Sequence, residues 1–512
     1  MRLRHSVHYP EIPFYELLER AADQYGEATA LLYEDERFTF RELDGLANSF
    51  ARALRERGVG SGDRVLLYLS NRPEWIVAAF GIQKAGASAV LVSSALKLAE
   101  VRHAAELTNP RIAITSADSA SVAREAGLGD DLICVGAAED SADFWQLIST
   151  QPGQRLGLQL DPATHEAALC LSSGTTGLPK AVRHAHRSLV AGAIQWKMAL
   201  GMGPSDRLQT FTPLSHILGL ANVAAGLASG AVHRLFARFD LDSMLQSIQD
   251  DRITIGIAVA PVAIAMADHP KLESFDLSSL RYFNWCATPV TEDVARRFTE
   301  RTGVPWLTAY GATEAVVLSA NPVEQPKHWR IDTPGLPGPD VEMRIVDLET
   351  HKSVPIGETG EVVVRGPNVM QGYLPEAANE DAFLPGGWYR TGDVGWMEEE
   401  GWLHLTDRVK EMIKVSGFQV APAEIEGLLL AHPGVADCAV YGPPHPVKGQ
   451  MPHAAVVRHA DSSVSEEELI TWSGEQLANY KRLAAIEFVD EIPRTASGKA
   501  LRRVLLERFA DR

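Results

Sequence analysis

Short apolar runs alternate with amphipathic segments of helical length over roughly the first 310 residues. The apolar runs predict strands at 64–69, 88–92, 111–115, 231–236, 253–259 and 281–287. The amphipathic segments predict helices at 74–85, 98–107, 241–249 and 292–301. This alternation is typical of parallel sheets covered by helices, which bind ligands near the carboxyl ends of their strands.

The pattern changes at about residue 334. The short alternating runs at 341–346 and 360–364 lie among glycines and prolines, with no long helix between them. They predict a small antiparallel sheet or barrel. The residues after Arg408 have a mixed pattern of their own, so we expect a domain boundary at 407–410 that separates domain 1–407 from domain 408–512.

Two helix starts are predicted in the second of these domains. Pro422 fits the first turn of a helix that runs through 424–430. Ser465 and Glu468 fit a capping box that opens a helix extending to Tyr480.

Composition narrows the class of protein. The 512 residues suffice for two or more domains, and 46% hydrophobic with 22% charged residues is ordinary for a globular chain. Lys and Arg number 48 against 66 Asp and Glu, which gives a formal net charge of −18. This balance argues against a general nucleic-acid or anionic-membrane binder, and it requires any polyphosphate site to be locally positive.

Cysteine usage and hydropathy predict a cytoplasmic protein. The four cysteines have no zinc-type spacing and are interpreted as reduced thiols: Cys134, Cys170, Cys286 and Cys438. No apolar leader follows Met1, and the most apolar stretch, 257–267, is too short to cross a bilayer and contains a proline.

A loop of glycines and small hydroxyl residues follows the apolar run at 167–171 and ends in a lysine. Its glycines let successive N–H groups point into one concavity, which suits an anion, and its hydroxyls and lysine add donors and charge. The candidate phosphate-binding residues are Ser172, Ser173, Gly174, Thr175, Thr176, Gly177 and Lys180. The common P-loop pattern does not fit this loop, and the plain alternative is a polar surface loop.

Four further clusters are each weak alone. Residues 310–314, after a strand expected at 304–307, offer an aromatic face, a glycine turn, a hydroxyl and a carboxylate. Residues 388–393 place a carboxylate after a glycine turn, which also fits an ordinary Asx turn. Residues 407–420 are rich in charged side chains, which is also typical of a solvated linker. Residues 494–499 form a polar segment that contains one lysine.

In this order and spacing, the clusters resemble those of the adenylate-forming superfamily, which includes acyl- and aryl-CoA synthetases, nonribosomal-peptide adenylation domains and firefly-type luciferases. The resemblance runs from about Phe14 to Arg503 and is closest to the acyl/aryl-CoA ligases. It implies an α/β fold with a large N-terminal domain of two helix-covered, mostly parallel sheets plus a small β-barrel. A small, mobile α+β C-terminal domain would follow.

The resemblance also implies residue roles. The 172–180 loop would bind the β- and γ-phosphates of ATP, and Lys499 would bridge the substrate carboxylate and the α-phosphate. The other implied nucleotide contacts are Tyr310, Ala287 and Thr288 on adenine, Asp393 and Arg408 on the ribose, Thr313 on the α-phosphate, and Glu314 on Mg²⁺. In the small domain, Lys410 matches the hinge, Gly417 the glycine that lets pantetheine pass, and Lys414 with Gln419 the positions that help to settle the adenylate.

The implied reaction has two steps. The acid reacts with MgATP to give acyl-AMP and pyrophosphate, and a thiol, expected to be coenzyme A, then displaces AMP. Because Lys499 and the Gly417 loop serve different steps, rotation of the small domain about Lys410 is expected between them.

The expected acid is small. By resemblance, His216 lies between the acyl site and the thiol tunnel, although a purely structural histidine is an alternative. Trp285, Cys286 and Ala309 add side chains where many relatives have smaller residues, which should shorten the pocket. We therefore expect a short-chain, cyclic or aromatic acid rather than a long fatty acid.

Other functions stay open. The acceptor can be a carrier-protein thiol or another nucleophile, and a tight pocket also suits a small inorganic acid such as nitrite. A non-catalytic nucleotide-binding relative is a different class, against which the intact Lys499, Glu314 and Asp393 argue. No nucleic-acid or membrane partner is expected, and the oligomeric state, monomer or homodimer, stays open.

Overall fold

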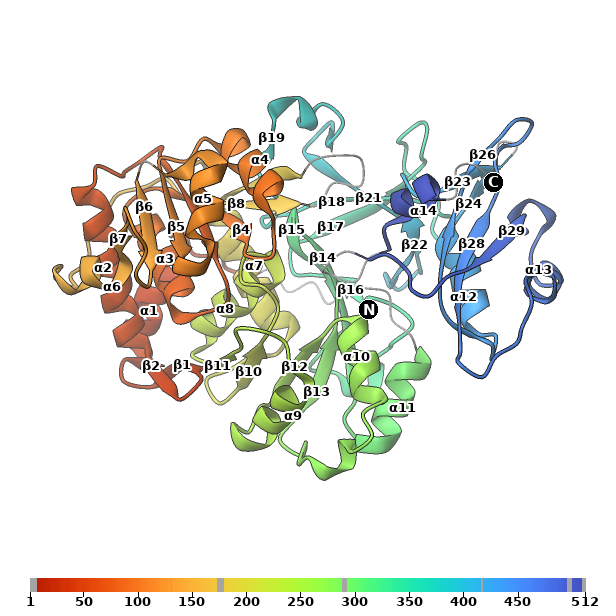
Figure 1. Ribbon diagram of the computed structural model, residues 1–512, viewed down its shortest axis with the longest axis horizontal. Helices are drawn as coiled ribbons and strands as arrows, with labels where there is room; N and C mark the ends of the chain where they lie inside the picture. The colour runs from red at the N-terminus through yellow and green to blue at the C-terminus, as the bar shows by residue number, and fades with distance from the viewer. Residues whose placement is uncertain are drawn as a thin grey trace. The chain divides into compact units, whose positions relative to one another are not determined.

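A computed structural model describes residues 7–129, 131–172, 179–287, 292–415, 418–494 and 500–508 of the chain (Figure 1). The chain divides into two compact units. The first comprises residues 1–258, 262–342 and 364–389, and the second comprises 259–261, 343–363 and 390–512. The predicted boundary at 407–410 lies inside the second unit and stays a prediction.

An eight-stranded sheet forms part of the first unit. Its order is β19 (Gly372–Leu374), β9 (Lys180–Ala185), β8 (Glu166–Ser172), β4 (Ser88–Ser93), β3 (Arg64–Leu69), β5 (Ile112–Ser116), β6 (Leu132–Val135) and β7 (Ala142–Asp143). Neighbours from β8 to β7 pair in parallel, whereas β8–β9 and β9–β19 are antiparallel.

A nine-stranded sheet is the other large sheet of this unit. Its order is β16 (Leu336–Pro337), β15 (Ala315–Ala320), β14 (Trp306–Ala312), β13 (Tyr282–Trp285), β12 (Ile255–Ala258), β10 (Arg207–Thr210), β11 (Val232–Leu235), β1 (Thr29–Tyr33) and β2 (Glu36–Thr39). All neighbours from β14 to β1 are parallel. The predicted pair of mostly parallel sheets is confirmed.

The helices up to residue 302 follow the predicted alternation closely; the helix expected at 74–85, for example, runs from Pro73 to Lys84. They are α1 (Glu16–Tyr25), α2 (Phe40–Glu56), α3 (Pro73–Lys84), α4 (Leu98–Thr108), α5 (Ala120–Ala123), α6 (Phe144–Ser149), α7 (His186–Ala199), α8 (Ile217–Ser229), α9 (Leu241–Asp250), α10 (Ala260–Ala267) and α11 (Glu292–Thr302). Helix α7 contacts β8 and β9 of one sheet and β15 of the other, so it lies between the two sheets.

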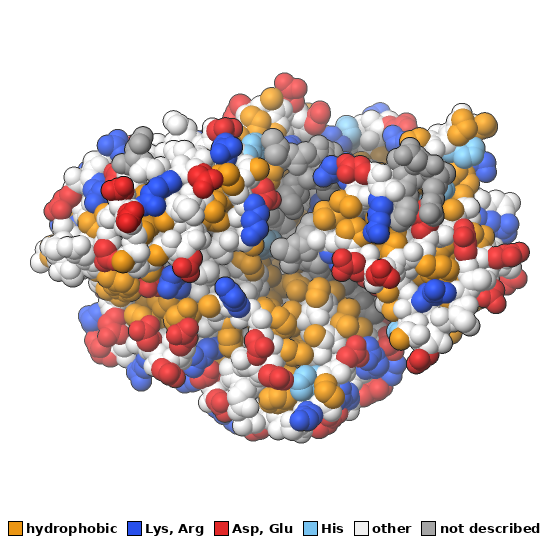
Figure 2. All heavy atoms as spheres, in the orientation of Figure 1, with side chains coloured by type: hydrophobic (Ala, Val, Ile, Leu, Met, Phe, Trp, Pro, Cys, Tyr) orange, Lys and Arg blue, Asp and Glu red, His pale blue; other side chains and the backbone are white. Residues whose placement is uncertain are grey.

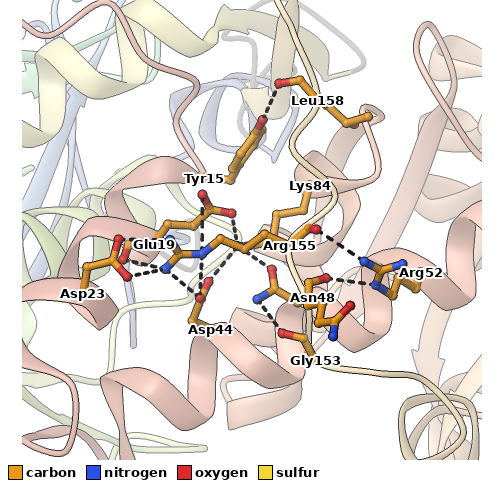
Figure 3. A network of polar contacts seen from close by, with 11 residues as sticks. Tyr15, Glu19, Asp23, Asp44, Asn48, Arg52, Lys84, Gly153, Arg155 and Leu158 are labelled. Atoms are coloured by element: carbon orange, nitrogen blue, oxygen red, sulfur yellow. Dashed lines mark hydrogen bonds and ion pairs between the residues drawn. The ribbon is translucent and has the colours of Figure 1, made fainter.

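The irregular segment between α6 and β8 is joined to the first helices by a polar network around the buried Lys84 (Figure 3). Lys84 Nζ, 3% exposed as a side chain, donates to Asp44 and to Asn48, each at 2.7 Å. Arg155 of the segment donates to the same Asp44 at 3.1 Å, and Asn48 donates to the carbonyl of Gly153. These bonds hold residues 153–155, in the segment that precedes β8, the strand that leads to the candidate phosphate loop.

A smaller sheet has the order β17 (Glu342–Val346), β18 (Gly360–Arg365), β21 (Trp388–Met397) and β20 (Phe383–Leu384), with β22 (Leu403–Arg408) beside β21. The pairs β20–β21 and β21–β22 are antiparallel, as the sequence predicts for this region.

The C-terminal part of the second unit has its own hydrophobic core, which includes Ile413, Val420, Leu429, Val440 and Val456. One sheet has the order β24 (Phe418–Val420), β23 (Ile413–Val415), β27 (Gly449–Gln450) and β26 (Pro444–His445), and the other β25 (Val435–Tyr441), β28 (His453–Arg458) and β29 (Ala485–Phe488). The helices are α12 (Pro422–Leu430), α13 (Glu466–Gly474) and α14 (Arg502–Arg508). The predicted α+β character is confirmed.

One helix boundary was predicted wrongly. Ser465 and Glu468 form the expected capping box, but α13 ends at Gly474 instead of reaching Tyr480. Glycine lowers helix propensity, and the chain then turns into a short 3₁₀ segment at 479–481. The amphipathic pattern alone did not mark this break.

The four cysteines are free and buried, as predicted. On the face shown in Figure 2, acidic and basic side chains are interspersed. No helix in the described part of the chain combines the length and apolar character needed to cross a membrane.

Candidate active site

The hairpin of β14 and β15 presents the 310–314 cluster. Tyr310 is half-buried near the end of β14, and the strand pairing shifts register between Tyr310 and Ala312. A Cβ on Gly311 would lie 2.1 Å from the carbonyl oxygen of Val316, so only glycine fits this close approach of two backbones. The local sequence therefore builds the sharp turn that presents Thr313 and Glu314.

Two other segments hold the backbone of this turn. His184 of β9 has its Nε2 atom 2.8 Å from the carbonyl oxygen of Thr313, and the amide of Met370 donates to the carbonyl of Glu314 at 2.8 Å. Burial lowers the pKa of His184 to about 4, so its imidazole is neutral at pH 7. Since a carbonyl can only accept, the ring proton lies on Nε2.

Tyr373 of β19 brings Lys180 and Glu314 to one place. Its hydroxyl donates to Glu314 Oε1 at 2.9 Å, and Lys180 Nζ lies 4.9 Å from the centroid of its ring. A cation and a carboxylate from distant segments thus both contact one buried side chain.

Among the described residues, no group of three or more His, Cys, Asp or Glu side chains is arranged to hold a metal.

The candidate phosphate loop connects two antiparallel strands, β8 and β9. Ser172 at the end of β8 pairs with Lys180 at the start of β9. The P-loop motif instead joins a strand to a helix, so the exclusion of that motif agrees with the fold. Ser173, Gly174, Thr175, Thr176 and Gly177 lie outside the described residues.

Asp393 and Arg408, which sequence reasoning assigned to one ribose site, are neighbours in the second unit. They pair across β21 and β22, and Arg408 Nε lies 3.0 Å from Asp393 Oδ1. Asp393 is only 7% exposed. Its carboxylate is therefore held in a fixed orientation by an adjacent guanidinium.

The chain turns sharply after β13, where adenine contacts were predicted. Ala287 has a φ of 64°, in the left-handed region that residues other than glycine rarely adopt. Such local strain is often found at binding sites. Thr288 lies outside the described residues.

The predicted pocket residues fall into two groups. Cys286 and Ala309 belong to one buried hydrophobic cluster, which also contains Tyr282. Trp285 packs its ring 5.2 Å from that of Trp306, and strand alternation turns it to the face of β13 opposite Tyr282. The structure therefore does not bring Trp285 together with Cys286 and Ala309.

His216 is the N-cap residue that precedes helix α8. Its Nδ1 atom accepts a hydrogen bond from the amide of Leu218 at 3.2 Å, so the imidazole caps the helix. This contact gives His216 a structural role as a helix cap. Its location beside the acyl site stays a prediction.

Comparison with known proteins decides the family. Residues 18–374 match the AMP-binding enzyme family, and residues 424–499 match the C-terminal domain of AMP-binding enzymes. The chain belongs to the AMP-binding enzyme family. The two matched segments include the 310–314 cluster and the position of Lys499.

Similar proteins include curated and structurally solved relatives. The rice (Oryza sativa subsp. japonica) 4-coumarate–CoA ligase 2 is 35% identical over 92% of this chain and 88% of its own. ATP-bound MatB from Rhodopseudomonas palustris is 27% identical with a TM-score of 0.89, covering 98% and 99% of the two chains. O-succinylbenzoate coenzyme A synthetase (MenE) from Bacillus subtilis, in complex with AMP, is 29% identical with a TM-score of 0.84, covering 97% and 98%.

These relatives establish the class of reaction. The AMP-binding enzyme described here is an adenylate-forming acid–thiol ligase of the acyl/aryl-CoA synthetase type. The predicted superfamily, fold class and type of activity are confirmed.

The predicted residues of the small domain are only partly described. Lys410 is exposed in the turn after β22, and Lys414 is exposed in β23, where it pairs with Gln419 of β24. Gly417 and Lys499 lie outside the described residues. The roles assigned to all of these small-domain residues stay predictions.

Sequence reasoning missed His184 and Tyr373. His184 lies four residues after Lys180, and its burial, which gives it its place beside Thr313, is visible only in the structure. Tyr373 follows the Gln371–Gly372 pair in a region of irregular pattern, and nothing local marks it.

Proposed function

We propose that this enzyme binds ATP with the residues that sequence reasoning selected. The 172–177 loop and Lys180 hold the β- and γ-phosphates, Tyr310 stacks on adenine opposite Ala287 and Thr288, and Asp393 with Arg408 binds the ribose. The observation that carries this proposal is the convergence of Lys180 and Glu314 on Tyr373, because it joins the loop lysine to the 313–314 pair.

The first step joins two anions, since the acid carboxylate attacks the α-phosphate and displaces pyrophosphate. Lys499 offsets this repulsion by contacting both groups, and Thr313 orients the α-phosphate. A unit cation at about 4 Å contributes roughly 4 kcal/mol at an effective dielectric near 20. The Glu314 carboxylate is an oxygen ligand of the type that Mg²⁺ prefers, and Mg²⁺ supplies charge that stabilises the phosphates when bound.

In the second step the thiolate of coenzyme A attacks the acyl carbonyl carbon, and AMP leaves. Gly417 leaves room for pantetheine, while Lys414 and Gln419 contact the adenylate. Rotation about the exposed Lys410 exchanges the Lys499 loop for the Gly417 loop between the steps.

The acid is compact, of the size of an aromatic ring with a short side chain. Cys286 and Ala309 are 6% and 8% exposed within a packed cluster, which leaves little depth for an alkyl chain. Relatives named for 4-coumarate and o-succinylbenzoate act on aromatic acids of this kind. His216 lies between this pocket and the thiol path.

The test is pyrophosphate release by the purified enzyme across cinnamate-type, benzoate-type, short-chain and long-chain acids, with and without coenzyme A. We expect release with a compact acid that coenzyme A accelerates, and a pocket-widening Ala309→Gly variant that accepts longer acids. Preference for palmitate would contradict the pocket assignment. Release without any effect of coenzyme A would favour a carrier protein or another nucleophile.

The assignment of the two steps predicts opposite defects in two variants. Lys499→Ala should slow acid-dependent pyrophosphate release by about two to four orders of magnitude and spare thioester formation from supplied acyl-adenylate. Lys410→Pro should retain pyrophosphate release and lose thioester formation. Near-normal release by the first variant, or intact thioester formation by the second, would contradict the respective role.

A further inference from the structure

The hydroxyl and the ring of Tyr373 contact two different groups of the proposed nucleotide site. The hydroxyl donates to Glu314 Oε1 at 2.9 Å, and the ring face lies 4.9 Å from Lys180 Nζ. Tyr373 itself is 8% exposed. One buried side chain therefore contacts a carboxylate and a cation from distant parts of the sequence.

The hydroxyl groups of Tyr389 and Tyr373 donate in sequence toward the carboxylate of Glu314. An ionised carboxylate only accepts, so the single proton of the Tyr373 hydroxyl is directed at Glu314. The hydroxyl of Tyr389, 3.2 Å away, must then donate to Tyr373. Burial raises the pKa of Tyr389 well above its ordinary value, so Tyr389 stays a donor. Each bond polarises the next, which strengthens the hold on Glu314.

The backbone of Tyr373 is fixed independently. Its amide donates to Asn379 Oδ1 at 2.7 Å, and Asn379 Nδ2 donates to its carbonyl at 3.1 Å. Tyr373 also pairs with Val182 between β19 and β9. Because the backbone of Tyr373 is held in this way, its hydroxyl can orient the carboxylate of Glu314.

We propose that Tyr373 is a positioning residue that holds Glu314 in the orientation needed for the divalent cation that accompanies ATP. A carboxylate has about four acceptor sites, and the hydrogen bond from Tyr373 occupies one of them and fixes its direction. Partners that orient a metal-binding side chain typically affect metal affinity 10- to 100-fold when removed. This inference rests on the proposed role of Glu314.

The test compares ATP affinity in excess Mg²⁺ with ATP affinity in EDTA by calorimetry, without acid so that no turnover occurs. The ATP-induced rise in Tm is read in parallel, so that weak binding is still measured. In Tyr373→Phe, which keeps the ring beneath Lys180, we expect affinity in Mg²⁺ to fall about tenfold or more and affinity in EDTA to change less than twofold. Equal losses in both media, or no loss in either, would overturn the inference.

Further variants separate the possible failures. Glu314→Gln should lose the Mg²⁺-linked affinity, and adding Tyr373→Phe to it should cause no further loss. If Glu314→Gln has no effect, the proposed role of Glu314 fails; if it has an effect and Tyr373→Phe has none, only the present inference fails. Tyr389→Phe, a milder change if Tyr373→Phe folds poorly, should show a smaller loss in the same direction.

Tyr68→Phe is the matched control. Tyr68 is also a buried tyrosine, 3% exposed, and its hydroxyl donates to the carbonyl of Leu96 at 2.8 Å. We expect this variant to lose some thermal stability and to keep the full effect of Mg²⁺ on ATP affinity.

Discussion

At the scale of single residues, the pairing of Asp393 with Arg408 gives the ribose assignment a direct test. Hydrogen bonds to a charged group contribute about 1.5–3 kcal/mol, so Asp393→Ala should weaken ATP binding roughly 10- to 100-fold. Because the loss arises at the ribose hydroxyls, the variant should also discriminate less between ATP and 2′-deoxy-ATP. Calorimetric titration of both nucleotides measures the two effects.

Asp251→Ala serves as the control, since Asp251 forms an ion pair with Arg234 at 2.6 Å and its side chain is also largely shielded from solvent. It should leave the ratio of the two nucleotide affinities unchanged. If Asp393→Ala weakens both nucleotides equally, the ribose assignment is wrong.

At the scale of secondary-structure elements, the β14–β15 hairpin positions Thr313 and Glu314 through its register. Gly311→Ala would place a Cβ 2.1 Å from the Val316 carbonyl, and backbone cannot yield without shifting the turn. Overpacking of this kind costs about 1–3 kcal/mol, so we expect a lower Tm and about a tenfold or greater loss of ATP affinity. Thermal melts with and without ATP measure both.

Gly203→Ala is the control for this prediction, because a Cβ at Gly203 meets nothing within 4 Å. It should bind ATP normally. Normal ATP binding by Gly311→Ala would show that the turn can shift without disturbing the site.

At the scale of the whole molecule, buried histidines make stability depend on pH. Burial lowers the pKa values of His184, His186 and His233 to about 4, 3 and 4, below the ordinary 6.5. The folded state keeps these rings neutral while the unfolded chain takes up protons below pH 6.5. These histidines therefore cost the fold nothing above pH 6.5, and stability falls below pH 6.5 by about 1.4 kcal/mol per pH unit for each histidine until its folded pKa is reached.

We expect Tm to fall between pH 7.5 and 5, as measured by scanning calorimetry. His233→Leu removes one of these groups and should reduce this fall. His233 is suitable because it is 5% exposed and its nearest side-chain polar contact, with Thr210, is 3.5 Å long. A Tm that is constant over this range would contradict the prediction.

The sequence by itself determined the elements and the type of chemistry. Strand β3 was predicted at its observed bounds, 64–69, because side-chain periodicity is a local property. The 172–180 loop and the 310–314 cluster were also predicted from local sequence. Their glycines, hydroxyls, lysine and carboxylate indicate phosphate or metal binding whatever residues lie near them in the fold.

Only the tertiary structure decided which of these groups meet. Asp393 faces Arg408 because β21 and β22 pair in one register, and Tyr373 reaches Glu314 because β19 adds to the edge of β9. Trp285 points away from Cys286 and Ala309 because alternation along β13 is fixed by the sheet around it. Strand pairing and register depend on contacts between distant segments, which no local pattern contains.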